Sequence, residues 1–210
     1  MGRRGIKNID NKILQEVMLQ SYKNGIASVS TKEVARKLHI SEPVIFAHFK
    51  TKANLMAKTF AAAWNEFPHI FCFPHDLSNI ADDMAFTQYK EKVTIACAHP
   101  VALIYISDFL RSQYYSYNLV VELEGTYRKD IISLFKTLNP KLTDGELSLV
   151  AENFIETSIT TLVHIVKGHY PRSDETLLFY YVIRIYGFVA ILDMKGALAP
   201  ESYRKRFLGE

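Results

Sequence analysis

The sequence predicts an all-α protein in which a three-helix N-terminal module precedes a larger helical domain. Apolar residues recur at helical spacing along nearly the whole chain, and helix start and stop signals separate the segments. The sequence shows neither strand-like alternation nor an internal repeat. We therefore place the module at residues 1–52 and the larger domain at residues 53–210.

The first helical pattern runs from Asp10 to Tyr22, with its apolar residues on one face. Asn24-Gly25 supplies a stop, because glycine tolerates the left-handed conformation that follows a last helical turn. A second, short helix is expected to begin at Ser30, where Ser30-Thr31-Lys32-Glu33 has the sequence of a capping box.

A tight turn and a third helix follow. Ser41 is placed to cap this helix, and Pro43 fits its first turn, where a missing N–H costs little. Ile45 and Phe49, four residues apart, are expected to point inward. Thr51 is placed to cap a fourth helix, which connects the module to the larger domain and ends near residue 66.

Positive charge is concentrated in this first part of the chain. Residues 1–60 contain eleven basic and four acidic residues, a net charge of +7, whereas residues 61–210 carry −4. Two short helices joined by a tight turn and braced by an earlier helix form a helix-turn-helix, whose second helix enters the major groove of DNA. The basic charge favours phosphate binding, so the pattern predicts a DNA-binding module. A solvated lysine-rich surface and an ordinary helical bundle are the alternatives.

The outward face of the third helix is small, which permits close approach to base edges. Val44 on this face is suited to pack against a thymine methyl group. The predicted DNA-binding residues of this helix are Ser41, Glu42, Pro43, Val44 and Ala47.

A longer motif extends over residues 31–55 and includes Val34-Ala35, Ile40-Ser41, Ile45, His48-Phe49, Thr51-Lys52 and Leu55. These residues match, in register and without a gap, the DNA-binding signature of the TetR-family transcriptional regulators, which the chain therefore resembles. The family usually has tyrosine in place of Phe46 and glycine in place of His39. The first difference removes a hydroxyl that reaches phosphate in the family. The second strains the turn unless His39 adopts the left-handed conformation.

The resemblance implies phosphate contacts by Thr31, His48 and Lys52, and helix N-termini independently attract phosphate. Thr31 could instead only share the capping of the second helix, and His48 could be a solvated surface residue. Arg3 and Arg4 are expected to precede the first helix, either as an arm in the minor groove or as a disordered tail.

The rest of the chain keeps the helical pattern. Helices are expected at about 80–98, 101–114 and 117–138, then from the capping-box string Thr143-Asp144-Gly145-Glu146 to about residue 168 and from Ser173 to about residue 195.

The last two long helices are apolar on more than one stripe, which is more than a surface pair needs to bury. A second subunit is expected to cover the excess, and the resemblance implies a four-helix homodimer interface. A buried central helix in a monomer is the alternative. A dimer would read the two half-sites of a pseudo-palindromic operator. The predicted interface residues are Phe154, Ile155, Ile159, Leu162, Tyr181, Ile185 and Val189.

The middle helices are rich in aromatic residues. The resemblance implies a cavity among them for a small, largely apolar effector. Most of these side chains are nevertheless expected to belong to the core. The candidate pocket residues are Trp64, Phe67, Phe71, Phe86, Tyr89, Tyr105, Phe109 and Tyr117.

The sequence shows no catalytic motif, so we expect neither an enzyme nor a cofactor. Cys72-Phe73-Pro74-His75 and Cys97-Ala98-His99 do not have zinc-finger spacing, and we expect no metal site there. His164 and His169, five residues apart, are expected at an interface or on the surface. The longest apolar run, residues 101–106, is far shorter than the roughly 18 residues of a membrane span, and no signal-peptide pattern follows the basic start. We expect a cytoplasmic protein without a membrane partner.

Two functions remain after these exclusions. The first is a ligand-responsive homodimeric regulator, a repressor by resemblance, that binds double-stranded DNA and is released by a small-molecule effector. The second is an all-α adaptor or co-activator that acts through a protein partner without binding an operator. The departures at Phe46 and His39 are what motivate the second function.

Overall fold

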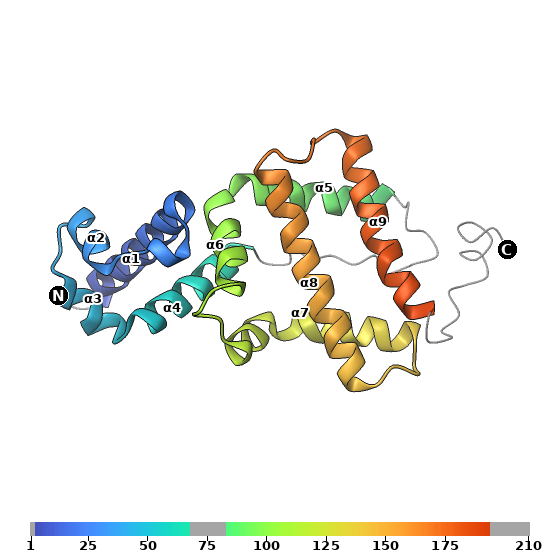
Figure 1. Ribbon diagram of the computed structural model, residues 1–210, viewed down its shortest axis with the longest axis horizontal. Coiled ribbons are helices and arrows are strands. Elements are labelled where there is room, and N and C mark those ends of the chain that lie inside the picture. The colour runs from blue at the N-terminus through green and yellow to red at the C-terminus, as the bar shows by residue number, and fades with distance from the viewer. Residues whose placement is uncertain (1–2, 68–82, 194–210) are drawn as a thin grey trace. The chain divides into compact units, whose positions relative to one another are not determined.

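The computed structural model describes residues 3–67 and 83–193 (Figure 1). Every regular element in these residues is a helix, which confirms the predicted all-α class. The chain forms two compact units, one made of Met1–Pro68 and His99–Leu123 and the other of His69–Ala98 and Glu124–Glu210.

The first unit is built around the N-terminal helix. It contains α1 (Arg3–Asn24), the short 3-10 helix η1 (Ile26–Ser28), α2 (Thr31–Lys37), α3 (Glu42–Phe49), α4 (Lys52–Asn65) and α6 (Pro100–Leu110). Helix α1 packs against α2, α4 and α6. Helix α3 contacts both α2 and α4. Apolar side chains of α1, α2, α3, α4 and α6 are buried in this unit, which fixes α3 relative to α1.

The second unit packs three long helices together. It contains α5 (Asp83–Ala98), α8 (Asp144–Val166) and α9 (Asp174–Asp193), each in contact with the other two (Figure 1). The helix α7 (Tyr117–Leu138) begins in the first unit, kinks at Gly125 with φ 47° and ψ −121°, and continues in the second. Phe135 of α7 meets Phe154 of α8 edge to face, with ring centroids 6.3 Å apart.

Local capping signals set several of the helix starts. The Thr143 hydroxyl accepts a hydrogen bond from the Glu146 backbone N–H at 3.3 Å, and the Glu146 carboxylate accepts one from the Thr143 N–H at 2.9 Å. The capping box predicted here is therefore confirmed. Thr51 likewise accepts from the Asn54 N–H at 3.1 Å and begins α4. Helix α6 ends at Leu110, earlier than expected, because the Ser112 side chain closes a turn there.

The compact units divide the chain elsewhere than at the predicted boundary, residue 52. Helix α4 buries Leu55, Met56 and Phe60 inside the first unit rather than outside it. Phe60 stacks on Phe109 of α6 with ring centroids 4.4 Å apart. The Tyr105 hydroxyl donates to the Met56 carbonyl at 2.9 Å, and burial raises the pKa of this hydroxyl. These contacts join α4 to α6 within the first unit.

Among the described residues, α8 alone is long and apolar enough as a single helix to cross a membrane. Half of its most apolar 18-residue window is buried inside the protein. A core helix passes the same test of length and composition, and the buried face of α8 against α5 and α9 accounts for its hydropathy.

Candidate nucleic-acid interface

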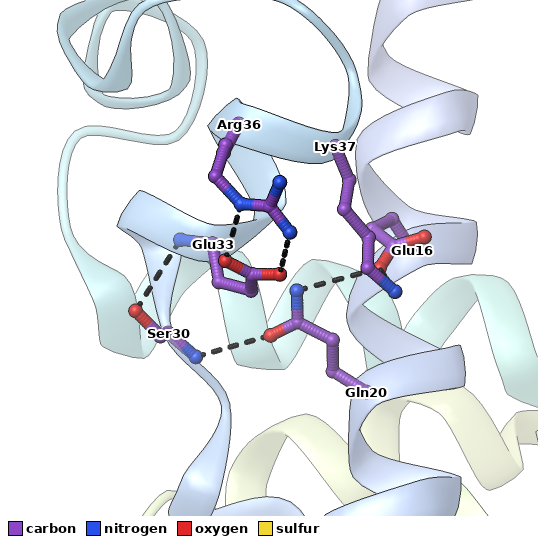
Figure 2. A network of polar contacts seen from close by, with 6 residues as sticks. All are labelled: Glu16, Gln20, Ser30, Glu33, Arg36 and Lys37. Atoms are coloured by element: carbon purple, nitrogen blue, oxygen red, sulfur yellow. Dashed lines mark hydrogen bonds and ion pairs between the residues drawn. The ribbon is translucent and has the colours of Figure 1, made fainter.

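The start of α2 is held by side-chain hydrogen bonds from both α1 and α2 (Figure 2). The Ser30 hydroxyl caps α2 by accepting from the Glu33 N–H at 3.4 Å. Of the capping box expected here, only the bond from the Glu33 N–H to the Ser30 hydroxyl forms. The Glu33 carboxylate turns instead to the Arg36 guanidinium, with two hydrogen bonds of 2.7 and 2.8 Å, and this hydrogen bonding lowers the pKa of Glu33. The Ser30 N–H donates to the Gln20 side-chain oxygen at 3.2 Å.

Two further contacts complete this network, one within α1 and one between α1 and α2 (Figure 2). The Gln20 amide nitrogen donates to the Glu16 carboxylate at 3.3 Å, and the Lys37 ammonium lies 3.3 Å from the same oxygen. Glu16 and Gln20 are one turn apart on α1, so one face of that helix positions both ends of α2.

The turn between α2 and α3 is a left-handed helix end. His39 has φ 55°, its N–H donates to the Arg36 carbonyl at 3.3 Å, and the Ile40 N–H donates to the Ala35 carbonyl at 3.0 Å. This pattern is a Schellman motif, in which the residue after the cap is usually glycine. The expectation that His39 could occupy the left-handed region is therefore confirmed, and the turn keeps its geometry without glycine.

Helix α3 is fixed at its start by a bond to α2. The Thr31 hydroxyl donates to the Glu42 carboxylate at 2.5 Å, and Thr31 is buried. Both side chains were predicted to face DNA, but in the structure they bond each other across the two helices. Ser41 caps α3 with its backbone only, because its side chain makes no capping bond. The Ser41 hydroxyl is exposed at the start of the helix.

The outward face of α3 is left uncovered by the rest of the module. Ile45 and Phe49 are buried as predicted, while Pro43 and Ala47 are exposed and Val44 is half-buried. Sequence reasoning left out two exposed neighbours, Phe46 on the same helix and Lys50 at its C-terminal cap. The recurrence of exposed positions at 43, 46, 47 and 50 follows the helical period and could have identified both.

Two residues predicted to contact phosphate, His48 and Lys52, also make contacts inside the module. The His48 Nδ1 lies 2.5 Å from a carboxylate oxygen of Asp10, so α3 is tied to α1. The Lys52 ammonium donates to the Val29 carbonyl at 2.5 Å and lies 5.9 Å from the Tyr114 ring centroid. An ammonium carries three donors, so this bond leaves Lys52 able to contact a phosphate as well. His48 could have been a solvated surface residue, but its contact with Asp10 shows that it is not.

Arg3 and Arg4 belong to the first turn of α1, which begins at Arg3. The expected arm or tail ahead of the first helix is therefore wrong for these two residues. Their side chains lie outside the described part of the structure.

Comparison with known proteins agrees with this geometry. Residues 20–59, which span the end of α1 to the middle of α4, match the model of the bacterial regulatory proteins of the tetR family. The N-terminal module therefore has the sequence of a TetR-family DNA-binding domain. No curated protein matches the sequence.

Solved structures share the all-α TetR fold at low sequence identity. A TetR-like transcriptional regulator from Rhodococcus sp. RHA1 aligns with a TM-score of 0.57 and 14% identity over 90% of this chain and 99% of its own. BioQ, solved with its double-stranded DNA operator, gives 0.54 and 13% over 86% and 98%. A Shewanella sp. PV-4 protein described as a TetR-family candidate gives 0.60 and 17% over 87% and 95%. At such identities the likeness concerns the fold.

The aromatic residues predicted to line a cavity fall into both units of the chain. In the first unit Phe67, Tyr105 and Phe109 are buried, whereas Trp64 is half-buried and Tyr117 is exposed. In the second unit, Tyr89 and Phe86 pack on Tyr181 with centroid distances of 5.2 and 6.2 Å. Phe71 lies outside the described residues. The buried rings among them, Phe67, Tyr89, Tyr105 and Phe109, belong to the core.

The predicted interface residues are placed differently from expectation. Phe154, Ile155, Ile159, Leu162 and Tyr181 are already buried inside the protomer, so they have little surface left for a second subunit. Exposed apolar side chains on the same two helices are Leu149, Leu178, Phe179 and Ile183. The side chains of Ile185 and Val189 lie outside the described part.

The cysteine and histidine pairs were considered for metal binding in the sequence. Cys72 and His75 lie outside the described residues. Cys97 is a half-buried thiol, and His99 contacts the Glu66 carboxylate at 3.3 Å.

Proposed function

We propose that this TetR-family regulator is a homodimeric repressor that binds a pseudo-palindromic DNA operator and is released by a small, largely apolar effector. The observation that carries the proposal is the outward face of α3. Its small exposed side chains, Pro43 and Ala47, stand above a helix anchored by buried Ile45 and Phe49. Such a face can approach the floor of the major groove closely.

The charges and hydroxyls around this face support phosphate contacts beside the bases. The Ser41 side chain makes no capping bond, and Lys50 and Lys52 stand at the far end of α3 and the start of α4. The structure of BioQ with its double-stranded DNA operator, which shares the fold, also supports DNA as the partner. We assign direct base contact to Pro43, Val44 and Ala47 and backbone contact to Ser41 and Lys52.

The effector and the dimer belong to the same proposal. The aromatic residues of both units favour an apolar effector, and Trp64, the only tryptophan, packs 5.8 Å from Phe60. Because indole emission responds to nearby ligands, a blind screen read by Trp64 quenching is expected to find the effector class. An effector releases DNA when it binds better to a conformer with displaced recognition helices, at a coupling of about 1–3 kcal/mol.

The test is duplex binding by the full chain, measured by fluorescence anisotropy with DNA from its own upstream promoter region and a shuffled duplex of equal length. We expect selective binding that weakens steeply with salt, because phosphate contacts release counterions. Ala47→Leu is expected to abolish the selectivity by keeping α3 out of the groove. Ser41→Ala is expected to weaken binding with a stability change within about 0.5 kcal/mol.

Ala98→Leu is the matched control, since Ala98 is also exposed but lies at the end of α5 in the second unit. It is expected to bind DNA like the natural chain. An absence of duplex binding even at low salt, together with recovery of a stable complex with another protein, would support the adaptor function instead.

A further inference from the structure

Helix α8 ends in a second Schellman motif, which brings two histidines together. Gly168 has φ 74°, its N–H donates to the Ile165 carbonyl at 3.0 Å, and the His169 N–H donates to the His164 carbonyl at 2.9 Å. In this motif the residue three positions before the cap and the second residue after it make a side-chain contact. Those two residues here are His164 and His169, where apolar side chains are usual.

The two imidazoles face each other through the same ring atom. His164 Nδ1 and His169 Nδ1 are 3.1 Å apart, and both side chains are accessible to solvent. The His164 ring also stacks on Tyr170, with centroids 4.9 Å apart, and Tyr170 stacks on Tyr180 of α9 at 4.4 Å. Backbone hydrogen bonds on one side and a stack of rings on the other therefore hold the nitrogens in place.

We propose that His164 and His169 form a two-histidine binding site for a late transition-metal ion of the Zn²⁺, Ni²⁺ or Cu²⁺ class. Imidazole nitrogen is a preferred ligand of these ions. Two such nitrogens bonded to one ion at about 2.0–2.1 Å and an angle near 100° stand about 3.1–3.2 Å apart. The observed separation of 3.1 Å therefore admits an ion with little movement of either ring.

Binding changes the tautomer of one ring. With no ion present, two neutral rings at this separation share one hydrogen bond, for which one Nδ1 must carry its hydrogen. An ion takes a lone pair from each Nδ1, so the proton of the donor ring moves by way of water to Nε2, the far nitrogen of its own ring, and both rings stay neutral. Water completes the remaining positions. Among the residues that the structure describes, no group of three or more histidine, cysteine or acidic side chains forms a cluster for a metal, so this site has two protein ligands.

The Schellman motif is what makes two ligands sufficient for measurable binding. Once one imidazole holds the ion, the second is already within reach, and the second bond forms as an intramolecular step. Gly168 sets this geometry, because a side chain at its positive φ strains the backbone. The site therefore depends on three positions, 164, 168 and 169.

The experiment is isothermal titration of the untagged full chain with NiSO4 and with ZnCl2. We expect saturable binding of one ion per protomer at these residues, and at least about tenfold weaker binding in His164→Gln and in His169→Gln, because each removes one arm of the chelate. Gly168→Ala retains both histidines and is expected to weaken binding as well. Circular dichroism verifies that each variant is folded.

His99→Gln is the matched control, because it removes an exposed histidine from the other unit and leaves both proposed ligands. Paramagnetic broadening by Ni²⁺ of the imidazole NMR signals of His164 and His169, and not of His99, gives a second readout. Binding that is equal in the natural chain and the His164→Gln/His169→Gln double variant overturns the proposal, as does broadening confined to other histidines.

Discussion

The second unit contains a buried ion pair that the sequence analysis did not single out. The Arg128 guanidinium donates to the Glu124 carboxylate at 2.6 Å, and both side chains are almost fully buried. Its other terminal nitrogen donates to the Ser148 hydroxyl at 3.0 Å and to the Ser148 carbonyl at 3.2 Å, which links α7 to α8. Burial raises the pKa of Glu124, and the hydrogen bond from Arg128 opposes this rise.

Arg128→Met is expected to destabilise the protein by about 3–5 kcal/mol, because it leaves the Glu124 carboxylate buried without a partner. The measurement is the free energy of unfolding from urea denaturation at neutral pH. Lys129→Met is the control, since the neighbouring Lys129 is exposed, and it is expected to change stability by less than about 0.5 kcal/mol. Equal changes in the free energy of unfolding for the two substitutions would show that the buried ion pair does not stabilise the protein more than an exposed side chain does.

Two helix ends use the same left-handed motif with different residues. Helix α8 is followed by Gly168 at φ 74°, as the motif favours, whereas α2 is followed by His39 at φ 55°. A side chain in the left-handed region costs roughly 1–2 kcal/mol, which glycine avoids at the expense of greater freedom in the unfolded chain. The turn of the helix-turn-helix is thus a place where this sequence retains strain.

His39→Gly is expected to stabilise the protein by about 0.5–1 kcal/mol, because the substitution relieves the backbone strain and the entropic cost of glycine offsets only part of this gain. Thermal and urea unfolding both report the change. Lys37→Gly, two residues earlier at the last position of α2, is expected to have the opposite sign at about 1 kcal/mol, because glycine has a low helix propensity and the change removes the Lys37 contact with Glu16. A destabilising His39→Gly substitution would mean that the imidazole makes contacts worth more than the strain.

Helix positions followed well from the sequence because their signals are local. Ser30, Thr51 and Thr143 each cap the helix they were predicted to begin. The contacts of the DNA-facing residues did not follow, because they join positions far apart in the chain. Thr31 meets Glu42, and His48 meets Asp10 across 38 positions. Such pairs depend on how α1, α2 and α3 pack against one another. Hydrophobic periodicity predicts which face of each helix is buried, but not which helix covers it.

The same contrast between local patterns and distant contacts explains why the predicted interface residues are buried within the protomer. The apolar pattern of α8 and α9 indicates that these helices bury more than one stripe, but it cannot distinguish a stripe facing α5 from one facing a second subunit. In the structure the stripe of Phe154 and Ile159 is buried within the protomer. What remains exposed on α9 is a shorter row that includes Phe179 and Ile183, four residues apart.

Exposed apolar rows of this kind mark association surfaces, so the homodimer is expected to form through α9 at Phe179 and Ile183. Ile183→Asp places a charge in that surface and is expected to shift the sedimentation of the protein from dimer to monomer without changing its circular dichroism. Binding to a full pseudo-palindrome should then fall much more than binding to a half-site, because two linked recognition helices no longer act together. Ile95→Asp, at an exposed position of α5, is the control. A protein that stays dimeric as Ile183→Asp, or that dissociates equally as Ile95→Asp, would place the interface elsewhere.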